Sequence, residues 1–212
     1  MSRLPVHLIL LGPPGAGKGT QAAKLARRLG VANINPGRIL REAAAGESPV
    51  SHQIRDRMAA GQLVDDQLVD QLVRERLEAL GPGQGFILDG YPRTAGEARS
   101  LQETLARLGR LRPPPLVVWL QASPGVLVRR LRDRATDEHR PDDSERAIGR
   151  RLEVHRDNAR ALRDALAGWT DLIEVDADQP PDAITREIVR ALRRQAVVWT
   201  VPRVSTLFRS DR

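Results

Sequence analysis

The sequence contains no cysteine and no long apolar run, and these two absences exclude several classes of protein. Without thiols, a disulfide scaffold, a thiolate metal site and a cysteine nucleophile are all excluded. No segment approaches about 18 uninterrupted apolar residues, so we expect no transmembrane helix. The apolar run near the N-terminus ends in a Gly-Pro turn and lacks a small-residue cleavage site, which favours a first β-strand over a signal peptide. We therefore expect a cytoplasmic protein that does not contact membranes.

Aromatic residues and lysines are also scarce. Aromatics make up 3% of the chain, and of the 34 basic residues only Lys18 and Lys24 are lysines. A net charge of +7 would suit nucleic acid, because basic side chains neutralise phosphates. However, acidic residues are interspersed along the chain and few aromatics are available to stack on bases. Nucleic acid is therefore not the expected partner.

Short apolar runs alternate with segments of helical periodicity, a pattern typical of a parallel sheet built from βαβ units. The apolar runs predict strands at residues 6–11, 31–34, 85–89, 116–121 and 171–175. The helical patterns cover residues 17–29, 39–45, 51–60, 66–80, 95–108, 124–134, 144–166 and 181–194. We expect an α/β fold whose parallel sheet is covered by helices on both faces.

A glycine-rich stretch, GPPGAGKGT at residues 12–20, follows the first predicted strand and opens a predicted helix. In such a loop the glycines let successive backbone N–H groups turn inward, and the helix N-terminus favours negative charge. The compact ammonium of Lys18 suits a phosphate better than a broad guanidinium at this point. A strict Walker A motif has Ser or Thr directly after the lysine, whereas in this chain Gly19 precedes Thr20. The stretch predicts a nucleotide phosphate site.

This loop variant resembles that of the adenylate kinase family, and three later motifs follow in the family's order. They are GQLV at 61–64, GFILDGYPRT at 85–94 and RPDDSERAIGRRL at 140–152. The resemblance covers roughly residues 5–194 and implies a three-layer P-loop NTPase-type domain over residues 1–194. It also implies a helical lobe for a nucleoside monophosphate (NMP) at 35–64 and a short lid at 132–143. Residues 195–212 lack a helical period and are left as a tail without assigned structure.

The resemblance implies reversible, Mg²⁺-dependent transfer of the γ-phosphoryl group of ATP to a monophosphate, with AMP the expected acceptor. GMP, CMP or UMP is an alternative acceptor. A catalytically weak nucleotide sensor and a basic nucleic-acid-associated protein are alternatives from other classes. Because the chain has no cysteine, the zinc-bearing lid of some relatives is excluded and no zinc is expected. We expect a monomer.

Phosphoryl transfer between two nucleotides gathers negative oxygens in one cleft, so cationic side chains must converge there. The resemblance gives catalytic roles to Lys18, Asp89, Arg93, Arg134, Arg140 and Arg151. The implied ATP site comprises Gly15, Ala16, Gly17, Lys18, Gly19, Thr20, Arg130, Arg134 and Gln179. The implied NMP site comprises Pro36, Arg41, Gln62, Leu63, Val64, Gly90, Tyr91, Pro92, Arg93, Glu97, Arg140 and Arg151. Asp89 ends a buried parallel strand beside the phosphate loop, where a carboxylate is well placed to hold Mg²⁺ through water.

Three departures from the family pattern concern the acceptor. The family usually reads Ser-Thr-Gly-Asp after its second strand, whereas this chain reads Asn-Pro-Gly-Arg at 35–38 and lacks the hydroxyl expected near the base. The family's adenine-reading glutamine is replaced by Glu97, and an ionised carboxylate accepts hydrogen bonds but donates none. We therefore expect a loosened preference in which AMP remains the best acceptor. His155 has no partner at metal-ligand spacing and is expected on the surface or in packing.

Overall fold

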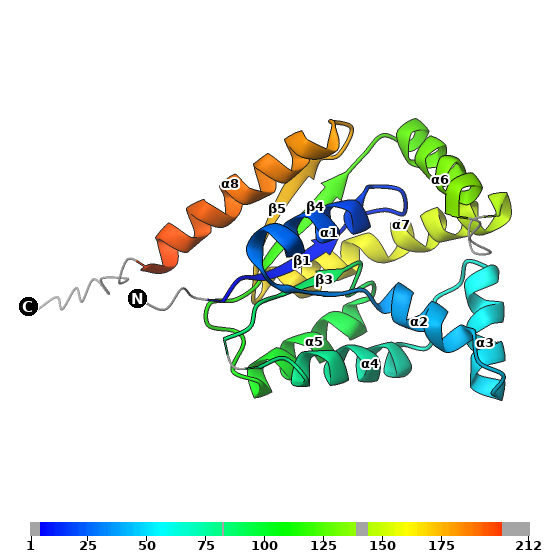
Figure 1. The fold of residues 1–212 in the computed structure, drawn as a ribbon, viewed down its shortest axis with the longest axis horizontal. Helices are drawn as coiled ribbons and strands as arrows, with labels where there is room; N and C mark the ends of the chain where they lie inside the picture. The colour runs from blue at the N-terminus through cyan, green and yellow to red at the C-terminus, as the bar shows by residue number, and fades with distance from the viewer. Residues whose placement is uncertain (1–4, 82, 139–143, 201–212) are drawn as a thin grey trace, which may run out of the picture.

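The computed structural model describes residues 5–81, 83–138 and 144–200, with 137, 138 and 195–200 described by their backbone alone (Figure 1). The strands are β1 (His7–Leu11), β2 (Ala32–Ile34), β3 (Phe86–Asp89), β4 (Leu116–Gln121) and β5 (Asp171–Asp176). The helices are α1 (Lys18–Leu29), α2 (Pro36–Ala44), α3 (Pro49–Ala59), α4 (Asp66–Glu78), α5 (Ala95–Arg107), α6 (Pro124–Glu138), α7 (Glu145–Ala167) and α8 (Pro181–Thr200). The predicted α/β class is confirmed, with the P-loop kinase arrangement of strand, glycine-rich loop and helix at its start.

The strands form one parallel sheet in the order β2-β3-β1-β4-β5. β1 is therefore central, and its neighbours are β3 and β4. In the β1–β3 register Leu10 faces Asp89, and in the β2–β3 register Ile34 faces Leu88. The loops that follow β1, β2 and β3 consequently leave the sheet side by side at its carboxyl edge.

Helices cover both faces of the sheet, as the unbroken apolar strands predict. Leu8 and Leu10 of β1 pack in one buried cluster with Leu25 of α1 and with α8. Ile9 points to the opposite face and packs in a second cluster with Leu101 of α5 and with α4 and α7. Figure 1 shows α1 and α8 on one side of the sheet, and α4 and α5 on the other. Alternation along a single strand thus divides the core into two layers.

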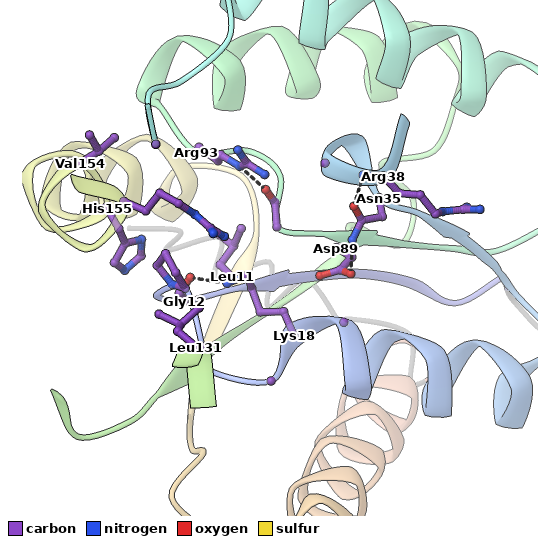
Figure 2. A pocket seen from close by; sticks show the side chains of 18 of the residues that line it. Leu11, Gly12, Lys18, Asn35, Arg38, Asp89, Arg93, Leu131, Val154 and His155 are labelled. Carbon is purple, nitrogen blue, oxygen red and sulfur yellow. Dashed lines mark hydrogen bonds between the residues drawn. The ribbon is translucent and has the colours of Figure 1, made fainter. Parts of the chain in front are cut away.

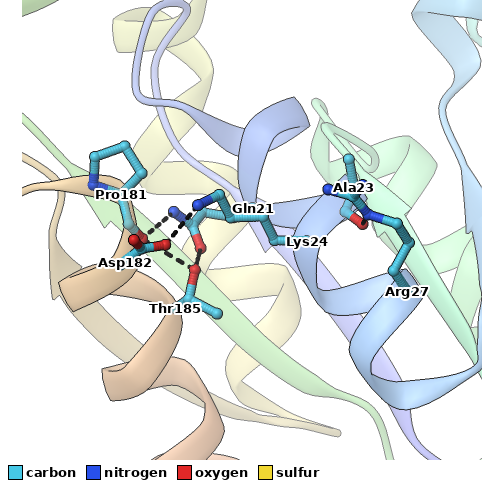
Figure 3. Close-up of polar contacts among 7 residues, drawn as sticks. All are labelled: Gln21, Ala23, Lys24, Arg27, Pro181, Asp182 and Thr185. Carbon is cyan, nitrogen blue, oxygen red and sulfur yellow. Dashed lines mark hydrogen bonds and ion pairs between the residues drawn. The ribbon is translucent and has the colours of Figure 1, made fainter.

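A buried polar contact fixes α1, the helix that begins at the phosphate loop, against α8 (Figure 3). The Gln21 side-chain amide donates to the Pro181 carbonyl oxygen at 2.9 Å, and the Thr185 hydroxyl donates to Gln21 Oε1 at 2.7 Å. An exposed ion pair joins Lys24 to Asp182 at 2.5 Å on the same side. Because both polar groups of the Gln21 amide have partners, the glutamine is buried without an unpaired atom.

Two helices extend four or more residues beyond their expected ends, and α2 begins at Pro36, three residues before its expected start. α6 continues to Glu138, four residues beyond the expected end at 134, so residues 132–138 of the expected lid are helical. The rest of that lid, 139–143, lies outside the described residues. α8 continues to Thr200, so the expected end at 194 is wrong. Neither glycine nor proline occurs in 195–200, so no strong helix breaker interrupts this stretch.

Within the described ranges, no helix combines the length and the apolar character needed to cross a bilayer.

Candidate active site

A cavity of about 690 Å³ lies at the carboxyl edge of the sheet (Figure 2). Its floor includes Leu11 of β1, Asp89 of β3 and Trp119 of β4, and its walls come from the phosphate loop, α2, α6 and α7. Ligands bind preferentially at this edge of a parallel α/β sheet, where loops from several strands converge. The cavity therefore brings together the motifs that are far apart in the sequence.

Most of the site residues expected from the sequence line this cavity. They are Gly15, Gly17, Lys18, Gly19, Thr20, Arg41, Gln62, Leu63, Val64, Asp89, Gly90, Pro92, Arg93, Arg130, Arg134 and Arg151. Five expected residues are not part of its lining: Ala16, Pro36, Tyr91, Glu97 and Gln179. Arg140 lies outside the described residues. The ligand roles of these last six residues stay predictions.

Lys18 is held inside the phosphate loop. Gly17 precedes it with a φ of 88°, a conformation that favours glycine, and thereby starts α1. The Lys18 ammonium donates to the carbonyl oxygens of Gly12 at 2.8 Å and Pro13 at 2.9 Å. Burial lowers the pKa of Lys18 to about 7, an effect that Asp89 opposes and that neighbouring arginines reinforce. The lysine therefore lies where cationic groups crowd together.

The arginines that lower the pKa of Lys18 are Arg93, Arg151 and Arg134, in decreasing order of effect. They come from the β3–α5 turn, α7 and α6, so three separate elements direct positive charge at one point. Like charges gathered at one point repel one another, and the Asp89 carboxylate opposes this effect at Lys18. Bound phosphate groups would relieve this repulsion, and the cavity is thus suited to an anion of high charge.

The turn after β3 brings Arg93 close to Lys18. Gly90 has a φ of 73°, and a Cβ built on it would lie 3.3 Å from Lys18 Cε, so the backbone passes directly against the lysine side chain. Arg93 Nε donates to the Gly90 carbonyl oxygen at 2.9 Å. A side chain at position 90 would separate the turn from the lysine and strain its backbone.

The residues near Asp89 fit Mg²⁺. Asp89 is 5% exposed, yet it lines the cavity together with Thr20 at the start of α1. Carboxylate and hydroxyl oxygens suit a hard cation that keeps much of its water and is held mainly by substrate phosphates. Among the described residues, no group of three or more His, Asp or Glu side chains could hold a metal ion alone. The carboxylate of Asp89 and the hydroxyl of Thr20 suit an ion that arrives with a nucleotide.

Glu97 is buried beneath the Arg93 turn. Its side chain is 2% exposed, and its carboxylate accepts a hydrogen bond from the Arg93 backbone N–H. Thr94 caps α5 by accepting from the Glu97 backbone N–H at 3.1 Å. Burial raises the pKa of Glu97 to about 7, although the contacts to Arg93 oppose the rise. In this structure the carboxylate supports the turn that carries Arg93.

Tyr91, on the same turn, also points away from the cavity. Its hydroxyl donates to Asp70 Oδ1 at 2.5 Å, and its ring is buried. This bond joins the β3–α5 turn to α4, while Thr94 donates to Asp66 Oδ2 at 2.8 Å one helical turn earlier on α4. α4 and the turn are therefore linked by two polar contacts behind the cavity.

Several residues that line the cavity were not expected from the sequence, among them Asn33, Trp119 and His155. The His155 and Trp119 rings lie 5.7 Å apart, and the Arg163 guanidinium carbon lies 4.1 Å from the centre of the Trp119 ring. His155 is thus a packing residue, as expected, but it also lines the cavity. Burial, with help from Lys18, lowers its pKa to about 4. Its spacing of four residues from Arg151 was the available signal, since such residues share a helix face.

Comparisons with known proteins agree with this geometry. A family model described as adenylate kinase matches residues 10–167. An adenylate kinase of Stenotrophomonas maltophilia (strain R551-3) is 38% identical over 188 residues, which cover 89% of this chain and all of that protein. Adenylate kinase 1 of Nostoc sp. (strain PCC 7120) is 41% identical over 186 residues, covering 88% of this chain and 98% of the relative. An adenylate kinase of Brucella ovis is 38% identical over 193 residues with the same coverage.

Proposed function

Because the chain belongs to the adenylate kinase family, we propose that it reversibly transfers the γ-phosphoryl group of ATP to AMP and so produces two molecules of ADP. The protein is a phosphotransferase of the P-loop type. The observation that carries the proposal is the convergence of Lys18, Arg93, Arg134 and Arg151 on one cavity between the phosphate loop and α2. Positioning and charge neutralisation are what phosphoryl transfer requires of a protein.

The two nucleotides would occupy opposite parts of the cavity. We assign the ATP phosphates to the backbone N–H groups of 15–20 and to Lys18, with Arg130 and Arg134 of α6 on the same side. We assign the AMP phosphate to Arg41 of α2 and to Arg93, and the AMP base to the region of 61–64. Gln179 at the ATP base and Arg140 at the transferring group complete the proposed site. Residues 35–64 and 132–143 are the proposed closing segments, because lobes that close over both substrates exclude water.

The chemical step needs no covalent intermediate with the protein. An oxygen of the AMP phosphate attacks the γ-phosphorus of ATP in line, and the bond between that phosphorus and the ADP leaving oxygen breaks. Since a phosphate monoester is largely ionised near neutral pH, its oxygen needs no general base. Lys18 and the arginines stabilise the negative charge on the transferring group.

Mg²⁺ supplies charge neutralisation on the phosphates, and we assign its protein contact to Asp89 through water. A cytoplasmic location and a monomeric state stay predictions from the sequence.

The test is a coupled assay of ADP formation from ATP with AMP, GMP, CMP and UMP as acceptors. We expect kcat/KM to be highest for AMP. If another monophosphate gives the highest value, the acceptor assignment is wrong. If none supports ADP formation while ATP still binds, as measured by calorimetry, the chain is a nucleotide sensor and the proposed activity fails.

A further inference from the structure

Asn35 follows β2 and lies directly beside Asp89. Ile34 faces Leu88 in the β2–β3 register, so Asn35, the first residue after β2, lies level with Asp89, the last residue of β3. Asn35 Nδ2 donates a hydrogen bond to Asp89 Oδ2 at 2.5 Å (Figure 2). Both side chains line the cavity. The contact therefore joins a buried carboxylate to a neutral donor at the point where we place Mg²⁺.

The other end of the same amide has a different partner. Asn35 Oδ1 accepts from the Arg38 backbone N–H at 2.7 Å, and this bond caps the N-terminus of α2. Opposite partners on its nitrogen and its oxygen fix the amide orientation, since a flipped amide would place its nitrogen against an N–H donor and its oxygen against a carboxylate. A cap needs only the oxygen. The hydrogen bond from Asn35 Nδ2 to Asp89 is thus a separate contact that capping does not require.

We propose that Asn35 is a positioning residue that holds the Asp89 carboxylate in the orientation needed to bind Mg²⁺. A hydrogen bond from a neutral amide to Oδ2 restricts rotation of the carboxylate and leaves its charge in place. The remaining lone pairs of the carboxylate can then accept hydrogen bonds from water on the ion. Groups that hold a directly ligating carboxylate typically change metal affinity by about 10- to 100-fold when mutated, and we expect the lower end of that range because Asp89 contacts the ion through water. This inference rests on the proposed role of Asp89.

Three variants separate positioning from capping. Asn35→Ser retains a good capping oxygen but has a side chain too short to keep its donor against Asp89. Asn35→Ala removes both contacts. Ser48→Ala is the matched control, because Ser48 caps α3 in the same lobe by accepting from Ser51 at 3.1 Å and does not contact Asp89. Thermal unfolding of the metal-free proteins reports the loss of a cap.

The decisive readout is binding of Mn²⁺, used in place of Mg²⁺, to each full-length protein in complex with a non-hydrolysable ATP analogue. Electron paramagnetic resonance measures the free ion directly. We expect Asn35→Ser and Asn35→Ala to raise the Mn²⁺ dissociation constant by about 10-fold each. We expect Ser48→Ala to leave it unchanged although this variant unfolds at a lower temperature. Asn35→Ala, which loses both contacts, should unfold at a lower temperature than Asn35→Ser, which keeps the cap.

Two results would overturn the inference. One is wild-type Mn²⁺ affinity in Asn35→Ser. The other is an equal loss of affinity in Ser48→Ala, which would show that any loosening of the lobe weakens the metal. Asp89→Asn distinguishes this inference from the proposed function. If Asp89→Asn weakens Mn²⁺ binding and Asn35→Ser does not, only the inference about Asn35 fails. If Asp89→Asn binds Mn²⁺ with wild-type affinity, the proposed contact between Asp89 and the metal is itself wrong.

Discussion

Glu97 supports Arg93 through the backbone: its buried carboxylate accepts the Arg93 N–H just before α5 begins. Arg93 in turn lines the cavity and lowers the pKa of Lys18. Glu97 is therefore linked to Lys18 of the phosphate loop through the turn that carries Arg93. The sequence predicts that Glu97 takes the place of the family's base-reading glutamine, so its replacement by glutamine tests that role and the support of the Arg93 turn together.

The first prediction concerns the choice of base. Glu97→Gln restores a group that both donates and accepts, so the ratio of kcat/KM for AMP to that for GMP should rise. An unmatched buried partner costs on the order of 1–3 kcal/mol, or about 10- to 100-fold in that ratio. Steady-state kinetics with the two acceptors checks this. An unchanged ratio would show that Glu97 serves the Arg93 turn alone.

The same variant changes how stability depends on pH. The folded protein raises the pKa of Glu97 from 4.5 to about 7, so the native state binds this proton more tightly than the unfolded chain. Its contribution to stability is present in full below pH 4.5 and is lost as the pH rises through about 7. The glutamine of Glu97→Gln does not titrate, so the variant does not lose this stability as the pH rises. Relative to the parent, the variant should gain up to about 3 kcal/mol of unfolding free energy between pH 4.5 and 8.

Urea unfolding of both proteins at pH 4.5 and pH 8 measures this difference. The pKa values of His7 and His155 are lowered to about 4, which makes their contributions to stability rise with pH. Both histidines are present in both proteins, so their contributions cancel in the difference. An equal difference in unfolding free energy at the two pH values would mean that Glu97 is not perturbed by burial.

Arg93 tests the NMP side of the cavity. We assign Arg93 to the AMP phosphate in both the ground state and the transition state, so Arg93→Ala should raise KM for AMP and lower kcat. We expect at least about 10-fold in each, because misplacing a reacting group is costly. Arg99→Ala, an exposed arginine on α5 outside the cavity lining, is the matched control. If the kinetic constants of Arg93→Ala equal those of the control, Arg93 does not contribute to the site.

The contact between α1 and α8 makes a prediction about stability. Thr185→Val removes the hydroxyl that donates to Gln21 Oε1 and leaves a buried acceptor unpaired. The free energy of unfolding should fall by about 1–3 kcal/mol. The exposed Asp182→Asn, which removes the ion pair with Lys24, should change it much less. If the two variants are equally stable in chemical denaturation, the buried contact does not hold the helices together.

Local patterns were sufficient for much of the fold. The apolar runs that predict strands lie within one or two residues of the observed ones, because parallel strands covered on both faces leave an unbroken apolar signal. The phosphate loop was also predictable, because its glycines and Lys18 lie within one short segment of the sequence. Contacts between distant segments were not predictable. Trp119 of β4 and His155 of α7 are 36 positions apart and meet only in the folded chain, and Asn35 meets Asp89 because β2 pairs with β3. No periodicity in the sequence encodes that pairing.

The central claim is that Lys18 stabilises the phosphoryl group during its transfer. The most direct test is the turnover number for ADP formation from ATP and AMP by Lys18→Met, which removes the ammonium and retains a flexible side chain of similar length. We expect kcat to fall by about 100-fold or more, with ATP binding and the unfolding transition nearly unchanged, because the charge acts mainly on the transition state. A kcat near that of the parent would contradict the account.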